Sequence, residues 1–344
     1  MTGDYLWDRT GWADPELVRL ERVLGTLQYQ PAARLEFKVP SATVVRGRQR
    51  GSYLVLAATA AAVLALVLVS WQQASVPRPA LVVTDVAGTP TIASRPIRAG
   101  ALLPVGEYLE TDASSSAYIA VADAGRVEVR SETRLGLLST KPGDHRLELA
   151  RGTMQAFIWA PPGQFSVKTP SSTAVDLGCL YTMTVDDDGI GLITVQMGWV
   201  GFEWRGRESF IPQGAACVTR PRLGPGTPHY EDTSASFRAD LDLIDVRGGT
   251  PADREAALKR VLVEARSKDV LTLWHLLSRV DAPQRDLVYD RLASFVAPPA
   301  AATKDAVRDG HREALDQWWD KLDLGTTAWW RMWKQQWRDN AAGK

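Results

Sequence analysis

The sequence predicts a membrane protein with a single transmembrane helix, followed by an all-β extracytoplasmic domain and an α-helical C-terminal domain. Three observations on the 344 residues predict this fold class: an apolar run at 53–71, alternation of period two through 80–230, and helical periodicity from 231 onward. We expect the β domain to be solenoid-like or a rolled sheet, and the helices to form antiparallel pairs. The predicted parts are the cytosolic helical segment 1–52, the transmembrane helix 53–71, the linker 72–79, the all-β domain 80–230 and the α-helical domain 231–344.

The predicted membrane span is the run 53–71, in which no residue carries a charge. Nineteen helical residues extend over about 28 Å, which is close to the thickness of the hydrocarbon core of a bilayer. Tyr53 and Trp71 stand at its two ends, where aromatic rings favour the membrane interface. The run therefore favours a lipid-embedded helix over a buried helix of a soluble core.

The charges beside this run predict its orientation. Three arginines lie just before it, and only Arg78 lies close behind it. Positive residues remain on the cytoplasmic side, so we expect 1–52 in the cytosol and the chain from 72 onward outside. The linker 72–79 is polar and contains proline, as is typical of a short stiff spacer.

The cytosolic segment 1–52 contains one amphipathic helix signal. Asp14, Pro15 and Glu16 form a helix start, and an apolar stripe of helical spacing follows. Fifty residues offer no large core to cover such a stripe, so it indicates a partner-binding surface, a small helical hairpin or a helix lying on the bilayer. The segment has no His or Cys, which excludes a zinc-binding fold there. The candidate partner-binding residues are Leu17, Leu20, Leu24 and Leu27.

The region 80–230 alternates polar and apolar residues between turn signals, which is typical of many short strands. It also contains an internal echo. The pattern around Gly152 (147–156) matches that around Gly198 (193–202), and in both a glycine divides two alternating strands. A repeated glycine corner indicates stacked β-arches, although two similar hairpins in a sandwich would give the same pattern.

The region 231–344 is predicted to be helical. Thr250-Pro251, Ser267, Asp281 and Thr303 are helix-start signals, and each precedes apolar residues of helical spacing. The short connections predict antiparallel helix pairs.

The two cysteines, Cys179 and Cys217, both fall in the part predicted to lie outside the cytoplasm. An oxidising compartment permits a disulfide between them, and we favour that pairing over two buried free thiols. No histidine neighbours them, so a metal site is not expected, and we expect no cofactor.

Five segments of the β region follow one another in a recognisable order. They combine G-x-x-L-x-x-G, a glycine turn between alternating strands, L-x-L-x-x-G, F-x-V-x-T-P and V-x-x-G-x-V, at 100–111, 116–130, 147–152, 165–181 and 195–202. Together they resemble the FecR domain family. The resemblance implies an all-β periplasmic sensory domain in a bacterial inner membrane protein whose cytosolic segment restrains a sigma factor.

The resemblance therefore implies transmembrane signalling, with a sigma factor as cytosolic partner, a periplasmic protein or envelope component as signal, and the lipid bilayer as anchor. The alternative is a structural envelope scaffold with no sigma-factor partner. Zero formal net charge gives no reason to expect direct nucleic-acid binding. The sequence has no Gly-x-Ser-x-Gly, no P-loop and no GxGxxG after a strand, which favours a binding module over an enzyme.

Overall fold

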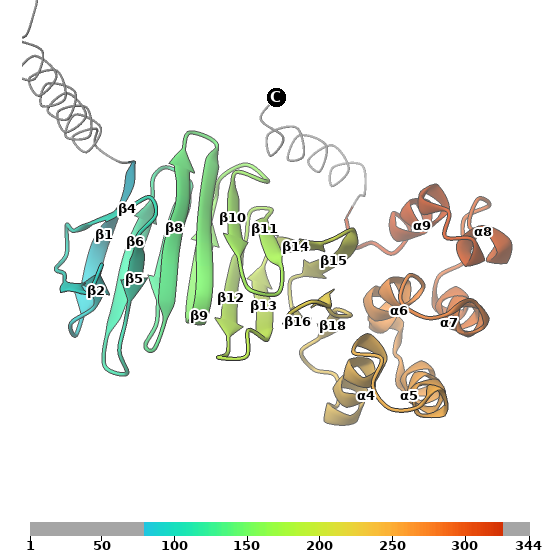
Figure 1. Ribbon diagram of the computed structural model, residues 1–344. Helices are drawn as coiled ribbons and strands as arrows, with labels where there is room; N and C mark the ends of the chain where they lie inside the picture. Colours follow the sequence, from blue (N-terminus) through green and yellow to red (C-terminus); the bar gives the residue numbers. More distant parts are fainter. Residues whose placement is uncertain (1–78, 326–344) are drawn as a thin grey trace, which may run out of the picture. The chain divides into compact units, whose positions relative to one another are not determined.

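The computed structural model describes residues 79–325, which belong to one compact unit. A β domain comes first and a set of helices follows it, in the order that the sequence predicts (Figure 1). The strands lie in two sheets that share one hydrophobic core, and neither sheet closes on itself.

The first sheet contains strands from both ends of the β domain. In spatial order its strands are β4 (Leu102–Pro104), β1 (Ala80–Ala87), β6 (Ser116–Val121), β7 (Gly125–Val129), the second half of β9 (Asp144–Ile158), β12 (Leu180–Val185), β13 (Gly191–Met197) and β16 (Ala215–Arg220), with the two-residue strands β17 (Gly224–Pro225) and β18 (His229–Tyr230) beside β16. All these pairs are antiparallel.

The second sheet faces the first across the core. Its order is β3 (Arg95–Pro96), β2 (Thr91–Ile92), β5 (Tyr108–Glu110), β8 (Arg134–Lys141), the first half of β9, β10 (Phe165–Lys168), β11 (Thr173–Asp176), β14 (Trp199–Trp204) and β15 (Arg207–Pro212). Only the β9–β10 pair is parallel among the strands described. Alternation drives this arrangement: in β6, for example, Ala117, Ile119 and Val121 are buried while the residues between them are not.

The two echoed glycines are the corners at which the chain passes from one sheet to the other. Gly152 lies within β9, where residues up to 151 pair with β8 and residues from 152 pair with β12. Gly198 separates β13 in the first sheet from β14 in the second. Both have positive φ, +90° and +75°, a conformation that glycine adopts without strain. Both glycines therefore mark passages between two open sheets, and the predicted solenoid-like or rolled sheet is wrong.

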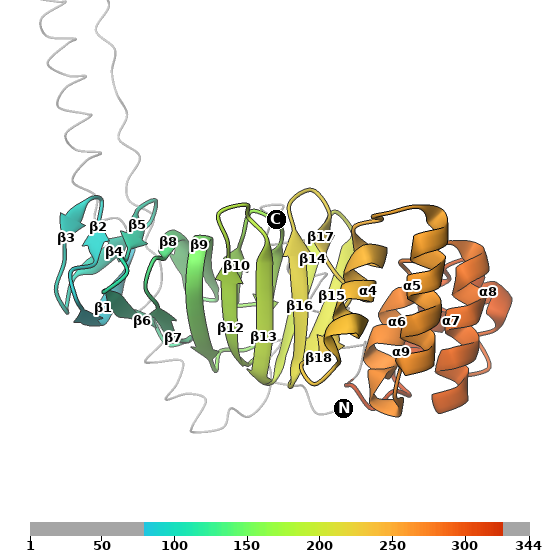
Figure 2. The same ribbon diagram turned by 90° about the horizontal axis from the view of Figure 1, so that it is seen from below.

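Six α-helices follow the strands in the part of the chain that the structure describes (Figure 2). They are α4 (Ala235–Asp245), α5 (Pro251–Glu264), α6 (Val270–Leu276) after the 3-10 turn η2 (Ser267–Asp269), α7 (Ala282–Phe295), α8 (Lys304–Arg308) and α9 (Arg312–Trp319). The pairs α4–α5, α6–α7, α7–α8 and α8–α9 are in contact, and α5 also contacts α7. Thr250, Asp281 and Thr303 are N-caps as predicted. Ser267 was predicted to cap a helix, but it begins the turn η2 and Asp269 precedes α6, while α4, which Ser234 caps, was not predicted.

The predicted single-span membrane fold is wrong as a description of the structure. No helix within 79–325 is long and apolar enough to cross a membrane. The longest of them, α5 and α7, have 14 residues each and bury only one side, and such a helix extends about 21 Å. The run 53–71 itself lies outside the described residues. The fold supported here is a mostly β domain followed by helices.

The helices are joined to the sheet edge by a buried histidine. The backbone N–H of Phe210 in β15 donates to Nε2 of His275 in α6 at 3.1 Å, so the proton of the imidazole is on Nδ1, which lies 2.8 Å from the Leu271 carbonyl oxygen. Burial holds the pKa of His275 well below its usual value, which keeps the ring neutral and able to accept. The rings of Phe210, Trp274 and Trp319 pack around this contact.

Candidate functional site

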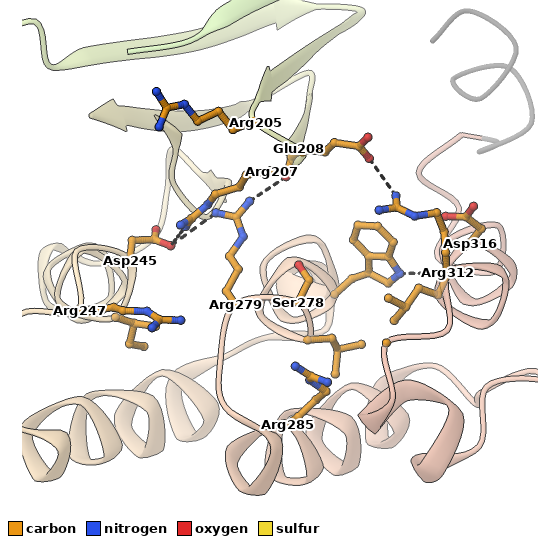
Figure 3. A pocket seen from close by; sticks show the side chains of 16 residues that line it. Arg205, Arg207, Glu208, Asp245, Arg247, Ser278, Arg279, Arg285, Arg312 and Asp316 are labelled. Carbon is orange, nitrogen blue, oxygen red and sulfur yellow. Dashed lines mark hydrogen bonds and ion pairs between the residues drawn. The ribbon is translucent and has the colours of Figure 1, made fainter. Parts of the chain in front are cut away.

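A pocket of about 500 Å³ lies where β15 meets the helices (Figure 3). Its walls come from the β14–β15 turn, the end of α4, the end of α6, α7 and the start of α9. These segments are far apart in sequence and meet because the helices pack against the last strands of the second sheet. This size is within the range of small-molecule sites.

Arginine dominates the lining of this pocket. Among the described residues that line it, six are arginines and three are acidic, so the wall carries an excess of three positive charges. The arginines are Arg205, Arg207, Arg247, Arg279, Arg285 and Arg312, and the acids are Glu208, Asp245 and Asp316.

Asp245, at the end of α4, gathers two of these arginines. Its Oδ1 lies 2.6 Å from Nη2 of Arg207 and 3.5 Å from Nη1 of Arg279, and it also accepts from the hydroxyl of Thr227 at 2.9 Å. The other oxygen, Oδ2, accepts the backbone N–H of Thr227 at 2.5 Å. One carboxylate therefore holds β15, the segment after β17 and the end of α6 together.

The side chain of Arg279 is 3% exposed and is held by β-domain oxygens. Its Nη2 donates to the hydroxyl of Ser209 at 2.6 Å and to the carbonyl of Glu208 at 3.0 Å, and its Nη1 donates to the carbonyl of Pro225 at 3.2 Å. Burial lowers the pKa of Arg279 to about 10, while Asp245 opposes that effect. The guanidinium is therefore still charged at neutral pH, inside the protein.

Three other arginines of the pocket form no ion pair within the described part of the chain. The guanidinium of Arg205 lies over the ring of Trp204, 5.5 Å from its centroid. Arg285 donates to backbone carbonyls only, including those of Arg308 and Val280. Arg247 is exposed, and its side chain makes no hydrogen bond to a described residue. These three side chains and the uneven pairing of Arg207 and Arg279 with the one carboxylate of Asp245 contribute the excess positive charge of the pocket.

The remaining lining is largely apolar, from Ile244, Trp274, Leu277 and Leu315. An apolar floor beneath a cationic rim suits a ligand that carries an anionic group on an apolar body. No group of three or more His, Cys, Asp or Glu residues within 79–325 could hold a metal ion. The arginines and apolar side chains that line the pocket are suited to binding a ligand.

The structure does not join Cys179 to Cys217, so the predicted disulfide is not formed. Both are buried free thiols. Cys217 in β16 pairs with Ile193 of β13, and the residue after Cys179 pairs with Met197 of the same strand on its other side. Two strand spacings amount to about 10 Å, which exceeds the Cα separation a disulfide allows. β13 therefore lies between β16, which contains Cys217, and β12, which begins directly after Cys179.

Each thiol has a partner of its own. The Cys217 thiol donates to the carbonyl of Gly226 at 3.3 Å, and burial raises its pKa to about 12. The Cys179 thiol donates to Oδ2 of Asp176, and burial raises the pKa of this thiol as well. Neither sulfur is a thiolate at neutral pH, so both behave as small buried side chains.

The carboxyl of Asp176 gives the chain a testable pH dependence. Asp176 accepts the N–H of Gly178 at 2.7 Å, and burial raises its pKa to about 7. A raised folded pKa stabilises the protein below the unfolded value near 4, and this stabilisation, worth about 4 kcal/mol, is lost as the pH rises toward 7. We expect Asp176→Asn to increase the melting temperature relative to wild type more at pH 8 than at pH 5.

Differential scanning fluorimetry of the full-length chain at both pH values measures this difference. Asp187→Asn is the control, because the Asp187 side chain is 91% exposed. Equal pH dependence in wild type and Asp176→Asn would show that the carboxyl does not titrate in this range.

The other predicted site residues, Leu17, Leu20, Leu24 and Leu27, lie outside the described residues, so their role as a partner surface stays a prediction. The pocket, in turn, was not predictable from the sequence. Its arginines are spread over more than a hundred residues with no shared motif. Arg205-Gly206 was visible only as a turn signal, and nothing in the sequence indicated that this turn meets α4, α6 and α9.

Comparison with known proteins identifies the middle of the β domain. Residues 107–201 match the family described as FecR protein. They form a FecR domain. The match confirms the resemblance seen in the sequence, and it runs from β5 to β14, so both glycine corners belong to the FecR domain. The pocket arginines, from Arg205 onward, come after it.

Two similar solved structures are of a protein from Parabacteroides distasonis ATCC 8503 that is described as a candidate anti-sigma factor. Each is 13% identical to this chain, with a TM-score of 0.32 and 45% of this chain covered. The match covers 74% of one of those chains and 73% of the other. No curated protein matches the sequence.

Proposed function

We propose that this chain is a FecR-type signalling regulator, in which the FecR domain senses a periplasmic signal and residues 1–52 restrain a sigma factor. The observation that carries the proposal is the FecR domain at 107–201. The proposal places 1–52 in the cytoplasm and the FecR domain in the periplasm, at the bacterial inner membrane. The FecR match supports a regulatory role rather than an enzymatic one.

The packing of the described unit offers a route for a signal. The FecR match ends within β14, which pairs with β15. β15 also forms hydrogen bonds with Arg279 and His275 of the helical part. A partner that shifts the helices therefore acts directly on β15, which pairs with β14, the last strand of the FecR match. Buried contacts of this kind have discrete arrangements, which is what a two-state signal requires.

The proposed cytosolic interface is the apolar stripe of 1–52. Leu20→Asp would place an unpaired charge against an apolar partner surface and should abolish binding, since burying such a charge costs several kcal/mol. Arg19→Asp, on the opposite face of the predicted helix, changes the charge by two units, against one for Leu20→Asp, and should leave binding nearly intact. Co-purification with the sigma factor encoded nearest to this gene, for the full-length chain and both variants, measures the difference.

Loss of co-purification with Leu20→Asp alone supports the proposed interface. Equal binding by both variants would contradict it. No binding by the wild-type chain would contradict the regulator model and favour a structural envelope scaffold instead.

A further inference from the structure

We propose that the arginine-lined pocket binds a small organic oxyanion, a carboxylate or a phosphate monoester attached to an apolar group. The observation behind it is that three arginines without an ion pair to any residue of 79–325, namely Arg205, Arg247 and Arg285, line the same pocket as several apolar side chains. This site lies after the FecR-matched residues and does not depend on the proposed control of a sigma factor.

The six arginines of the pocket divide into two groups. Arg207, Arg279 and Arg312 have acidic partners, Asp245 for the first two and Glu208 for the last, as the dashed lines in Figure 3 show. These pairs fasten β15 to the helices. The second group serves no such contact, so its charge is available to an incoming anion.

The buried pairs strengthen the attraction of the pocket for an anion. Arg279 keeps its charge although its side chain is almost fully buried, and it shares the one carboxylate of Asp245 with Arg207. In a region of low dielectric, an incompletely compensated charge acts over a longer distance than it does in water. The positive potential of the paired arginines Arg207 and Arg279 thus adds to that of the exposed arginines Arg205 and Arg247.

The apolar floor of the pocket favours a ligand that carries an apolar group as well as a negative charge. Trp274 of α6 and Leu315 of α9 are apolar residues that line the pocket, Trp274 being 9% exposed and Leu315 partly buried. Trp274 is fixed there by its indole N–H, which donates to the carbonyl of Leu315 at 2.9 Å. An inorganic ion would leave this surface uncovered, whereas an aromatic or aliphatic oxyanion would cover it.

Two rim arginines allow binding to be separated from folding. Arg205 and Arg247 have φ of 48° and 51°, in the left-handed region that asparagine tolerates better than arginine. Arg205→Asn/Arg247→Asn therefore removes two charges and relieves backbone strain at once. Arg222, with φ of 67°, is an exposed left-handed arginine that does not line the pocket, and Arg222→Asn is the matched control.

The experiment is isothermal titration calorimetry on the full-length chain with four probes: phenyl phosphate, 3-phenylpropionate, inorganic phosphate and benzyl alcohol. We expect at least one of the two aromatic anions to bind, about tenfold more tightly than inorganic phosphate, and benzyl alcohol not to bind. Whichever aromatic anion binds more tightly identifies the oxyanion as phosphate or carboxylate. Binding should weaken as salt rises from about 0.05 M to about 0.5 M.

We expect the double variant to weaken binding of the aromatic anion about tenfold or more, while its melting temperature equals or exceeds that of wild type. Arg222→Asn should bind as wild type does. The proposal is overturned if neither aromatic anion binds, if inorganic phosphate binds as tightly as phenyl phosphate, or if the double variant binds as tightly as the control.

Discussion

Alanine at Gly198 is expected to destabilise the chain by about 4 kcal/mol, or to prevent folding, because two costs add at this corner. The first is backbone strain, since a residue with a Cβ at φ +75° loses about 1–2 kcal/mol. The second is steric, since the new Cβ would lie 2.1 Å from the carbonyl oxygen of Gly178, and overpacking of this kind costs about 1–3 kcal/mol. The chain could relieve the clash only by moving the turn before β12.

Urea denaturation of the full-length chain measures this loss, and Gly106→Ala is its control. Gly106 has φ +91°, but a Cβ there would meet nothing within 4 Å. Strain alone predicts a loss of about 1 kcal/mol for the control. Equal losses at the two glycines would contradict the role of Gly198 as a crowded passage between the sheets.

Arg279→Met is expected to cost about 3–5 kcal/mol, because it removes one partner of a buried ion pair and leaves the other. Asp245 would keep Arg207, but the carbonyls of Glu208 and Pro225 and the hydroxyl of Ser209 would lose their shared donor. The methionine fills much of the space of the arginine stem, so the loss measures polar contacts rather than a cavity. Thermal and urea unfolding of the full-length chain provide the measurement.

Lys259→Met is the matched control for Arg279→Met. The ion pair of Lys259 with Glu255 in α5 has side chains 62% and 51% exposed, and such pairs contribute about 0.5 kcal/mol or less. If Arg279→Met unfolds at the same urea concentration as wild type, Arg279 does not fasten the helices to β15.

The local features of the fold were predictable because they depend on neighbouring residues. Alternation indicated the strands, Thr250 and Asp253 formed a capping box, and the echo around Gly152 and Gly198 marked two corners of the same kind. Helix α4 was missed although Ser234 and the spacing of Phe237 and Leu241 were visible, since it follows directly on the last strand.

What could not be predicted depends on contacts between distant segments. The disulfide prediction failed because β13 lies between β16, which contains Cys217, and β12, which begins directly after Cys179. The alternation of polar and apolar residues does not reveal the order of strands in a sheet. The pocket was not predictable for the same reason, since Arg205, Arg247 and Arg285 line one cavity only because the helices pack on β15. The single-span prediction rested on the hydropathy of residues 53–71, which lie outside the described residues.

Transcription from promoters of the neighbouring sigma factor tests the central claim most directly. The measurement compares cells whose own copy of the gene is deleted and replaced by wild type, Leu20→Asp or Arg19→Asp. The regulator model predicts that sigma-dependent transcripts rise on deletion, return to the basal level with wild type and Arg19→Asp, and stay high with Leu20→Asp. Transcript levels that do not respond to deletion, or that all three forms restore equally, would contradict it.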